Sequence, residues 1–216
     1  LLRLDEREAS GKSTIGHKLA QRLGYLYFDT GVMYRAVTWV ALQQGINILD
    51  EATITALAQR VRIDVVPPTV DDGRQYTVFA DSQDVTWAIR SAEVDASVSP
   101  VAAYAGVRKS LVAQQRRISD QGRVVMVGRD IGTVVLPGAD IKLYLDAQVE
   151  ARALRRYREL VARHQQADYD GVLTAMRRRD KIDSGREVSP LRPAPDAIII
   201  DTSDLSIEEV LEVVMG

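Results

Sequence analysis

Short apolar runs alternate with helical patterns along most of this chain, and this alternation limits the folds that it can adopt. Each run is long enough for a buried strand and too short for a stable helix. The runs span residues 1–4, 25–28, 124–127, 141–145 and 197–200. Strands that alternate with helices predict a three-layer α/β fold, in which a five-stranded parallel sheet carries helices on both faces. Ligands of such sheets bind beyond the carboxyl ends of the strands.

The helices are predicted from apolar residues that recur at three- and four-residue spacing. Ile15, Leu19 and Leu23 mark a first helix, which Gly24 ends. Asp50 is placed to cap a later helix at its N-terminus. The other helical patterns span 33–41, 54–61, 101–112, 149–161 and 207–214. The pattern that begins at Val101 predicts a single long helix.

Residues 62–90 have a different pattern. Polar and apolar residues alternate in 62–66 and again in 76–80, and turn-forming residues lie between these two segments. This pattern predicts a small antiparallel sheet that is inserted between helices of the main fold. The insert is either a surface lobe without a role or a module that grips a substrate, and the pattern favours neither.

Gly11-Lys12-Ser13-Thr14 matches the second half of the P-loop pattern G-x-x-x-x-G-K-[ST]. In that pattern, backbone N–H groups surround phosphate oxygens, the lysine neutralises the β- and γ-phosphates, and the hydroxyl reaches Mg²⁺. The start of the following helix adds partial positive charge. We therefore expect a nucleoside triphosphate site with Ser13 as the Mg²⁺ ligand, formed by Ser10, Gly11, Lys12, Ser13 and Thr14.

The first half of the P-loop pattern is altered. Glu6 stands where the pattern has its first glycine, and Arg7 and Glu8 follow. A side chain at this point can block the backbone conformation that surrounds phosphates, and carboxylates would repel a triphosphate. Two explanations remain open: residues 1–8 do not represent the authentic sequence, or the chain has lost much of its ability to use a triphosphate.

Composition excludes several classes of function. The chain has 216 residues, a formal net charge of -2 and no cysteine. This argues against a dedicated nucleic-acid binder and excludes disulfides, thiol nucleophiles and cysteine-based zinc sites. We find no apolar run long enough to span a membrane and no signal-peptide pattern, so we expect a single cytoplasmic domain over residues 1–216.

Two polar segments follow predicted strands. Asp29 and Thr30 fall at the end of the second run, and Arg35 lies about one helical turn further on. They either cap the next helix beside a solvated arginine or contact a ligand. Gly128-Arg129-Asp130-Ile131-Gly132-Thr133 follows the third run. Its glycines predict a tight bend that presents a cation and a carboxylate, and the alternative is a local surface ion pair.

Residues 177–186 contain five cations and two carboxylates. This segment is either the solvated end of a helix or a mobile lid whose arginines close over transferring phosphates. Arginine suits the second role because its planar fork is always charged and pairs with phosphate oxygens through two hydrogen bonds. Phosphoryl transfer depends mainly on positioning and on charge stabilisation, which a group of arginines with Mg²⁺ can supply.

Together these segments resemble the bacterial cytidylate kinases, which are nucleoside monophosphate kinases that phosphorylate CMP and dCMP. The resemblance covers nearly the whole chain, with motifs at 29–35, 89–94, 98–108, 128–133, 179–186, 189–191 and 200–203. It implies a P-loop kinase fold with a monophosphate-binding insert at 62–99 and a lid at roughly 160–188. It also implies transfer of the γ-phosphoryl group of ATP, with Mg²⁺, to CMP or dCMP. We expect a monomer without nucleic-acid or membrane partners.

The resemblance assigns roles to matching residues. Those expected around CMP are Thr30, Arg35, Ser99, Arg108, Arg129, Asp130, Arg179, Asp183 and Arg186. The phosphate would be held chiefly by Arg35, Arg129 and Arg179. Ser99, Arg179 and Asp183 would lie near the sugar, and the base would meet Thr30, Arg108, Asp130 and Arg186. The expected catalytic residues are Lys12, Arg129, Arg179 and Arg186. The family usually has an acidic residue where this chain has Val127.

The base assignment also has a physical reason. Cytosine presents an N4 amino donor, which a carboxylate such as Asp130 accepts, and its O2 and N3 acceptors suit arginine. Uracil reverses the pattern at positions 3 and 4, so we predict a preference for CMP over UMP. Two other hypotheses are a nucleotide-binding protein whose altered P-loop impairs catalysis, and an RNA-binding domain. The latter would use Arg152, Arg155, Arg156 and Arg158 together with the arginines of the lid, but these cations lack an accompanying aromatic platform.

Overall fold

A computed structural model describes residues 2–6, 12–162, 166–185 and 191–216. The chain divides into two compact units, which are described separately. Unit 1 comprises Leu1–Leu23 and Val127–Gly216, and unit 2 comprises Gly24–Met126. None of the helices within the described ranges is both long and apolar enough to cross a bilayer.

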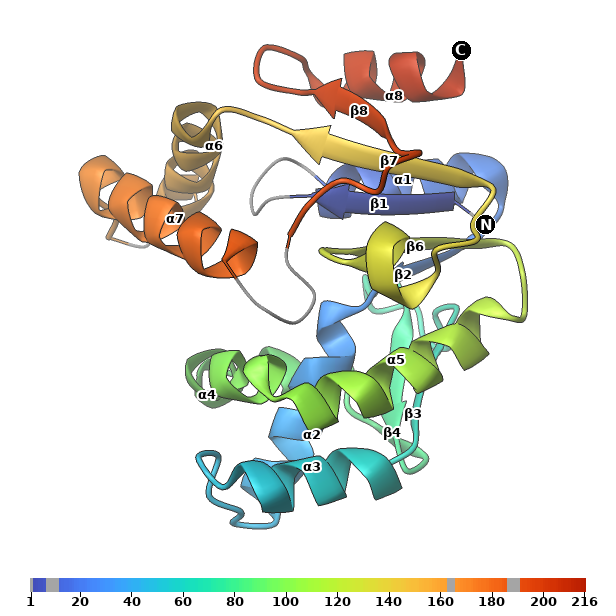
Figure 1. Cartoon of the computed structure of the whole chain (residues 1–216), viewed down its shortest axis with the longest axis vertical. Helices are drawn as coiled ribbons and strands as arrows, with labels where there is room; N and C mark the ends of the chain where they lie inside the picture. Colours follow the sequence, from blue (N-terminus) through green and yellow to red (C-terminus); the bar gives the residue numbers. More distant parts are fainter. Residues whose placement is uncertain (1, 7–11, 163–165, 186–190) are drawn as a thin grey trace. The chain divides into compact units, whose positions relative to one another are not determined.

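The described strands form a five-stranded sheet in the order β2-β6-β1-β7-β8. Their bounds are β1 Leu2–Glu6, β2 Leu26–Asp29, β6 Val124–Gly128, β7 Ile141–Asp146 and β8 Ile198–Asp201. Within unit 1, β7 pairs in parallel with β1 and β8, as Figure 1 shows. Each strand overlaps one of the predicted runs, with ends that differ by at most two residues, so the prediction of a five-stranded α/β sheet is confirmed.

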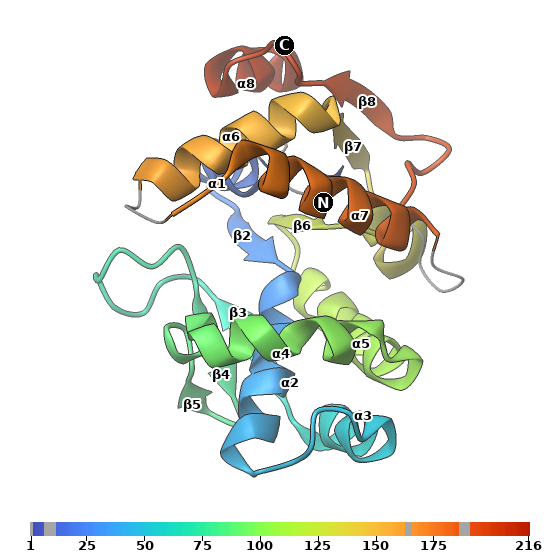
Figure 2. The ribbon, with the colours of Figure 1, turned by 90° about the vertical axis from the view of Figure 1, so that its left-hand side faces the viewer.

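The helices of unit 1 are α1 Lys12–Leu23, α6 Val149–Ala162, α7 Tyr169–Ser184 and α8 Ile207–Met215. Helices α6 and α7 lie side by side (Figure 2). Helix α8 begins with a capping box, in which Ser206 and Glu209 each bond the backbone N–H of the other. The helical patterns predicted at 15–23, 149–161 and 207–214 are therefore confirmed.

The buried residues of α6 are not the apolar ones of the periodic pattern over 149–161. Two apolar residues of that pattern, Leu154 and Val161, are 39% and 48% exposed. The buried residues are Arg152 and Ala153. Arg152 is buried because its guanidinium is satisfied internally: Nε donates to the carbonyl of Ala147, and Nη2 donates to Asp180 of α7 at 2.5 Å.

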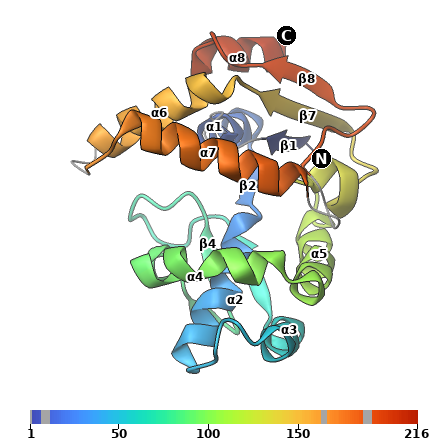
Figure 3. The ribbon, with the colours of Figure 1, turned by 60° about the vertical axis from the view of Figure 1, so that its left-hand side comes forward.

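Unit 2 contains four helices and a small sheet. The helices are α2 Gly31–Gln43, α3 Glu51–Arg60, α4 Ala92–Ala103 and α5 Ala105–Ser119, with a short turn η1 Ala88–Arg90. Helix α2 packs against α3, α4 and a strand of the small sheet (Figure 3). Asp50 accepts a hydrogen bond from the backbone of Thr53 at 3.1 Å, so the predicted cap of α3 is confirmed.

The predicted single helix over 101–112 is wrong, because the segment forms two helices that meet at Tyr104. The backbone of Tyr104 is extended there, with ψ of 122°. The hydroxyl of Tyr104 donates to the carbonyl of Ile48 at 2.9 Å. Gly106 follows, where a Cβ atom would lie 2.3 Å from the side chain of Thr55. The bend is thus set by contacts with residues distant in sequence, which a periodic pattern does not report.

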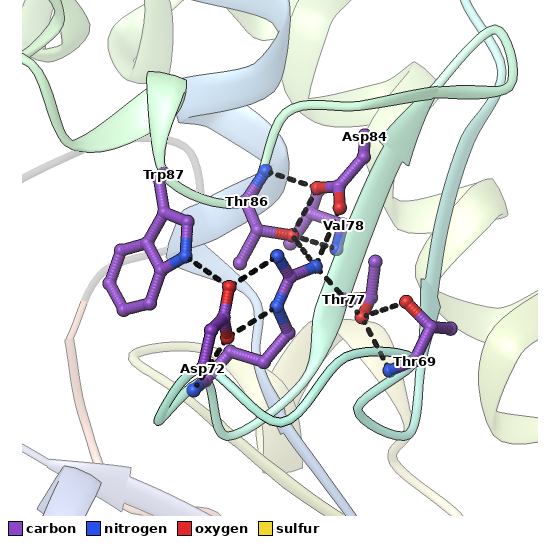
Figure 4. Close-up of polar contacts among 8 residues, drawn as sticks. Thr69, Asp72, Thr77, Val78, Asp84, Thr86 and Trp87 are labelled. Carbon is purple, nitrogen blue, oxygen red and sulfur yellow. Dashed lines mark hydrogen bonds and ion pairs between the residues drawn. The ribbon is translucent and has the colours of Figure 1, made fainter.

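The small antiparallel sheet predicted in 62–90 is present. Its strands are β3 Ile63–Val66, β4 Thr77–Ala80 and β5 Gln83–Asp84, in the order β3-β4-β5. Arg74 lies beside it and binds two carboxylates: both oxygens of Asp72, and Asp84 at 2.6 Å. The indole of Trp87 donates to Asp72 at 2.8 Å, and these side chains converge in Figure 4. An ion-pair network therefore ties the connecting loop to the sheet.

Candidate active site

The predicted substrate residues are divided between the two units. Unit 2 carries Thr30, Arg35, Ser99 and Arg108, and unit 1 carries Arg129, Asp130, Arg179 and Asp183. Arg186 lies outside the described residues. The structure thus determines each group's surroundings within its own unit.

The junction of β2 and α2 places Thr30 in a buried position. Asp29 ends β2 and accepts a hydrogen bond from the N–H of Gly31 at 2.9 Å. Thr30 stands at the N-cap position but makes no side-chain capping bond. The alternative that these residues cap the helix therefore holds for Asp29. Thr30 is buried, but its side chain does not cap the helix.

Arg35 is held one turn into α2 by the segment that follows the insert. Its Nη1 donates to the carbonyl of Ile89 at 3.1 Å and to Asp95 at 2.5 Å. The side chains of Arg35 and Asp95 are 33% and 56% exposed. An ion pair this exposed is weak, because water screens both charges. The guanidinium is therefore oriented by the protein while an anion could still compete for it.

Arg108 approaches α2 from α5. Its Nη1 donates to the carbonyl of Ala102 at 3.2 Å, and its guanidinium carbon lies 5.7 Å from the ring centroid of Tyr34. Arg108 is buried, whereas Ser99 of α4 is exposed. A planar cation packed over an aromatic ring is restricted in orientation, which suits a group that reads the edge of a base.

Sequence reasoning missed a pair of side chains near these residues. Tyr76 is buried, its hydroxyl accepts a hydrogen bond from Arg90 at 3.3 Å, and its ring centroid lies 5.6 Å from that of Tyr27. Burial, followed by the negative charge of Asp29, raises the pKa of Tyr76 to about 12. Tyr76 therefore stays neutral at physiological pH and joins the insert to the end of β2. The alternation of polar and apolar residues in 76–80 could have indicated that Tyr76 is buried.

In unit 1, Arg129 and Asp130 lie between strand β6 and a wide helical turn, η2 Ile131–Val135. The N–H of Val135 bonds the carbonyl of Asp130, and that of Leu136 bonds the carbonyl of Ile131, each five residues back. Turns of this width are rare and frequently occur at functional sites. Asp130 is buried. The predicted tight bend after β6 is thus a specific turn that begins at Asp130.

A carboxylate from β1 binds the start of this turn. Asp5 is 4% exposed, and its two oxygens accept hydrogen bonds from consecutive N–H groups, at 2.7 Å from Ile131 and 2.6 Å from Gly132. A Cβ atom at Gly132 would lie 3.0 Å from an oxygen of Asp5. Glycine therefore permits this close approach. Sequence reasoning missed Asp5, although an acidic residue at the end of a buried strand was a signal.

The described part of the expected triphosphate site is the start of α1. This helix begins at Lys12, its first turn contains no acidic residue, and the side chains of Ser13 and Thr14 are exposed. Glu6 is the last residue of β1 and pairs with Leu145 of β7. The side chain of Lys12, and the whole of Ser10, Gly11, Arg7 and Glu8, lie outside the described structure.

The charged segment at 177–186 continues helix α7 as far as Ser184. Asp180 binds the buried Arg152, and Arg177 pairs with Glu150 at 2.8 Å, so this part of α7 is attached to α6. The side chains of Arg179 and Asp183 are not among those described. The prediction that this segment moves as a lid stays a prediction.

Two of the four arginines considered for RNA binding are engaged within unit 1. Arg152 is 1% exposed and binds Asp180. Arg155 donates hydrogen bonds to the carbonyls of Thr202 and Ser203. Neither guanidinium is displayed as a cationic surface, which removes most of the support for that hypothesis.

Comparisons with known proteins give a consistent family. The family model described as cytidylate kinase matches residues 2–216. The cytidylate kinase of Herpetosiphon aurantiacus is 50% identical over 213 residues, which is 99% of this chain and 91% of the relative. That of Bacillus subtilis is 45% identical over 212 residues, covering 98% and 93%.

A solved structure shares the fold at low sequence identity. A shikimate kinase from Bacteroides thetaiotaomicron has a TM-score of 0.50 and 10% identity, with 99% of this chain and 95% of that chain covered. At this identity the likeness concerns the fold alone. The family match and the two relatives, by contrast, cover nearly the full length, and they confirm the family that the motifs predicted. The chain belongs to the cytidylate kinase family.

Proposed function

We propose that the chain transfers the γ-phosphoryl group of ATP to CMP or dCMP, giving CDP or dCDP. The observation that carries this proposal is the buried carboxylate of Asp130 at the start of the turn after β6, in a chain of this family. Burial suits a carboxylate that recognises a base, because a hydrogen bond is stronger where water is excluded.

Base recognition would rest on complementary donors and acceptors. Asp130 accepts from the N4 amino group of cytosine, and Arg108 donates to its acceptors, with Thr30 and Arg186 nearby. UMP would place a carbonyl oxygen against the carboxylate and an N–H against a donor. Each such unpaired contact costs about 1–3 kcal/mol, so CMP is preferred.

Phosphate binding would fall to arginines. Arg35, Arg129 and Arg179 hold the monophosphate, and Ser99 and Asp183 lie near the sugar with Arg179. Arg129 and Arg179, with Arg186, also stabilise charge on the transferred group, as does Lys12. A nucleotide phosphate is already an anionic nucleophile, so no general base is required. This is a chemistry of positioning and electrostatics.

The start of α1 fits a triphosphate with Mg²⁺. Its first turn offers the partial positive charge of a helix N-terminus, exposed hydroxyls and no carboxylate. Lys12, with Ser10, Gly11 and Thr14, would hold the phosphates, and Ser13 would contact the metal. Within the described ranges no cluster of three acidic or histidine side chains is arranged to hold a metal ion. When bound, ATP supplies the phosphoryl group and Mg²⁺ neutralises phosphate charge.

The wider organisation follows the family. Residues 62–99 act as the monophosphate-binding insert, and a lid at roughly 160–188 closes over the phosphates and suppresses hydrolysis of ATP by excluding water. The protein acts as a cytoplasmic monomer with small-molecule substrates.

A second candidate function is nucleotide binding without phosphoryl transfer, which the carboxylates at Glu6 and Glu8 favour. One experiment separates the two candidates. The purified chain is verified by intact mass and N-terminal sequencing, and ADP release is then followed with CMP, dCMP and no acceptor. Lys12→Ala is the control for the phosphate site. Acceptor-dependent ADP release that Lys12→Ala abolishes supports the kinase, whereas CMP binding without turnover supports the second candidate.

A further inference from the structure

The carboxylate of Asp5 is arranged to control the turn that carries Arg129 and Asp130. Its two oxygens accept hydrogen bonds from two successive backbone N–H groups of that turn, those of Ile131 and Gly132. Both bonds are short and the carboxylate is buried. Such charge-assisted bonds are about twice as strong as neutral ones.

Two further features of the structure fix Asp5 and the turn in place. A Cβ atom at Gly132 would lie 3.0 Å from Asp5 and 3.3 Å from the Cβ of Ala194, so the backbone of the turn lies directly against the carboxylate. Asp5 also lies on β1, whose pairing with β7 fixes the place of its Cα opposite Tyr144. The turn is therefore held by a group that is itself fixed in a sheet.

We propose that Asp5 is a positioning residue for base recognition, an inference that rests on the proposed function. By fixing the N–H groups of Ile131 and Gly132, it sets the direction in which the side chain of the preceding Asp130 leaves the backbone. A hydrogen bond to a base weakens steeply when its angle changes, so selection of CMP over UMP depends on this anchor. In this role Asp5 acts through the turn and not by contact with the substrate.

The test replaces Asp5 by asparagine, which keeps the shape but supplies only one acceptor oxygen for the two N–H groups. Amide hydrogen exchange of Ile131 and Gly132, measured by NMR without nucleotide, should accelerate by about tenfold or more for at least one of them. In the same variant, KM for CMP should rise by about fivefold or more while KM for ATP changes by less than about twofold. The ratio of kcat/KM for CMP to that for UMP should fall.

Gly132→Ala provides a second variant that keeps the carboxylate. Its new methyl group must move the turn or Asp5 by a few tenths of an ångström, so we expect the same loss of CMP selectivity in weaker form. Leu57→Ala is the matched control for stability. Leu57 is buried in α3 of unit 2, so its truncation lowers the stability of the fold without touching the turn.

The outcomes separate this inference from the proposed function. A wild-type chain without CMP turnover contradicts the proposed function, and the exchange measurement then still decides whether Asp5 holds the turn. The inference on Asp5 is overturned if Asp5→Asn keeps the wild-type selectivity and KM for CMP in an active enzyme. It is equally overturned if both amides stay protected, or if Leu57→Ala lowers CMP selectivity as much as Asp5→Asn.

Discussion

Arg35 and Arg74 lie in the same unit and both are ion-paired, but their surroundings differ. The side chain of Arg74 is 6% exposed and binds two carboxylates, those of Asp72 and Asp84. Arg35 is 33% exposed and binds one carboxylate, which is itself more than half exposed. The hydrogen bonds that Arg74 donates to Asp72 and then to Asp84 raise the pKa of Arg74, which is therefore a permanent partner for both carboxylates.

The difference indicates that the carboxylates around an arginine decide whether its guanidinium can also bind a ligand. The charge of Arg74 is balanced by two carboxylates of the insert, so its role is to hold the loop and the small sheet together. Arg35 is oriented by a carbonyl and by one screened carboxylate, so a phosphate can compete for its N–H groups. We expect four effects from this contrast, in decreasing order of size.

The largest effect is expected for Arg35→Ala. Removing a fork that makes two charge-assisted bonds to phosphate should lower kcat/KM for CMP by about a hundredfold. The midpoint of thermal unfolding should hardly change, because the ion pair of Arg35 is exposed. Steady-state kinetics and calorimetry measure the two quantities, and Arg35→Lys, which keeps the charge without the fork, should recover only part of the activity. A wild-type kcat/KM in Arg35→Ala would remove this residue from the site.

Arg74→Met should show the opposite pattern. The methionine leaves Asp72 and Asp84 facing each other without their shared cation, so the midpoint of thermal unfolding should fall clearly. In the protein that remains folded at 25 °C, kcat/KM for CMP should stay within about threefold of wild type. If instead activity falls far more than stability, Arg74 has a role in catalysis and the contrast with Arg35 fails.

The hydrogen-bond network around Arg74 should be lost only at low pH. Hydrogen bonds from Arg74 and then Trp87 hold the pKa of Asp72 well below its usual value. The stability that this carboxylate contributes is present above its unfolded-state pKa, about 4, and is lost as pH falls through the lower folded-state pKa. The chemical shift of the indole N–H of Trp87 should therefore keep its hydrogen-bonded value below about pH 4. In Arg74→Met it should be lost at a higher pH than in wild type, and identical profiles would contradict this account.

The smallest effect is expected for Asp95→Asn. The ion pair of Asp95 with Arg35 is exposed and is worth at most about 1 kcal/mol, so KM for CMP should change by less than about fivefold. Steady-state kinetics of Asp95→Asn and of the wild type with varied CMP measure this change in KM. A change as large as that of Arg35→Ala would mean that Asp95 contacts the substrate or fixes Arg35 far more strongly than its exposure indicates.

Local patterns predicted much of the fold. All five strands of the sheet, the cap at Asp50 and the antiparallel insert follow from apolar runs, a capping residue and alternation, which act within a few residues of sequence. Motif order likewise indicated the family. These features need no knowledge of which distant segments meet.

The features that escaped prediction all depend on distant contacts. Helices α4 and α5 separate at Tyr104, whose hydroxyl reaches Ile48. Arg152 is buried because Asp180 of another helix balances it. Asp5 acquires a role only because the turn at Ile131 lies beside it in the fold. The roles of Arg179, Asp183 and Arg186 stay predictions from motif order.

The central claim is that a buried carboxylate selects cytosine in an active kinase. The most direct measurement incubates the sequence-verified chain with ATP, Mg²⁺ and an equimolar mixture of CMP and UMP, and follows CDP and UDP by chromatography. At early times their ratio equals the ratio of the two kcat/KM values. We expect an excess of CDP of about tenfold or more. Equal rates, or no nucleoside diphosphate at all, would contradict it.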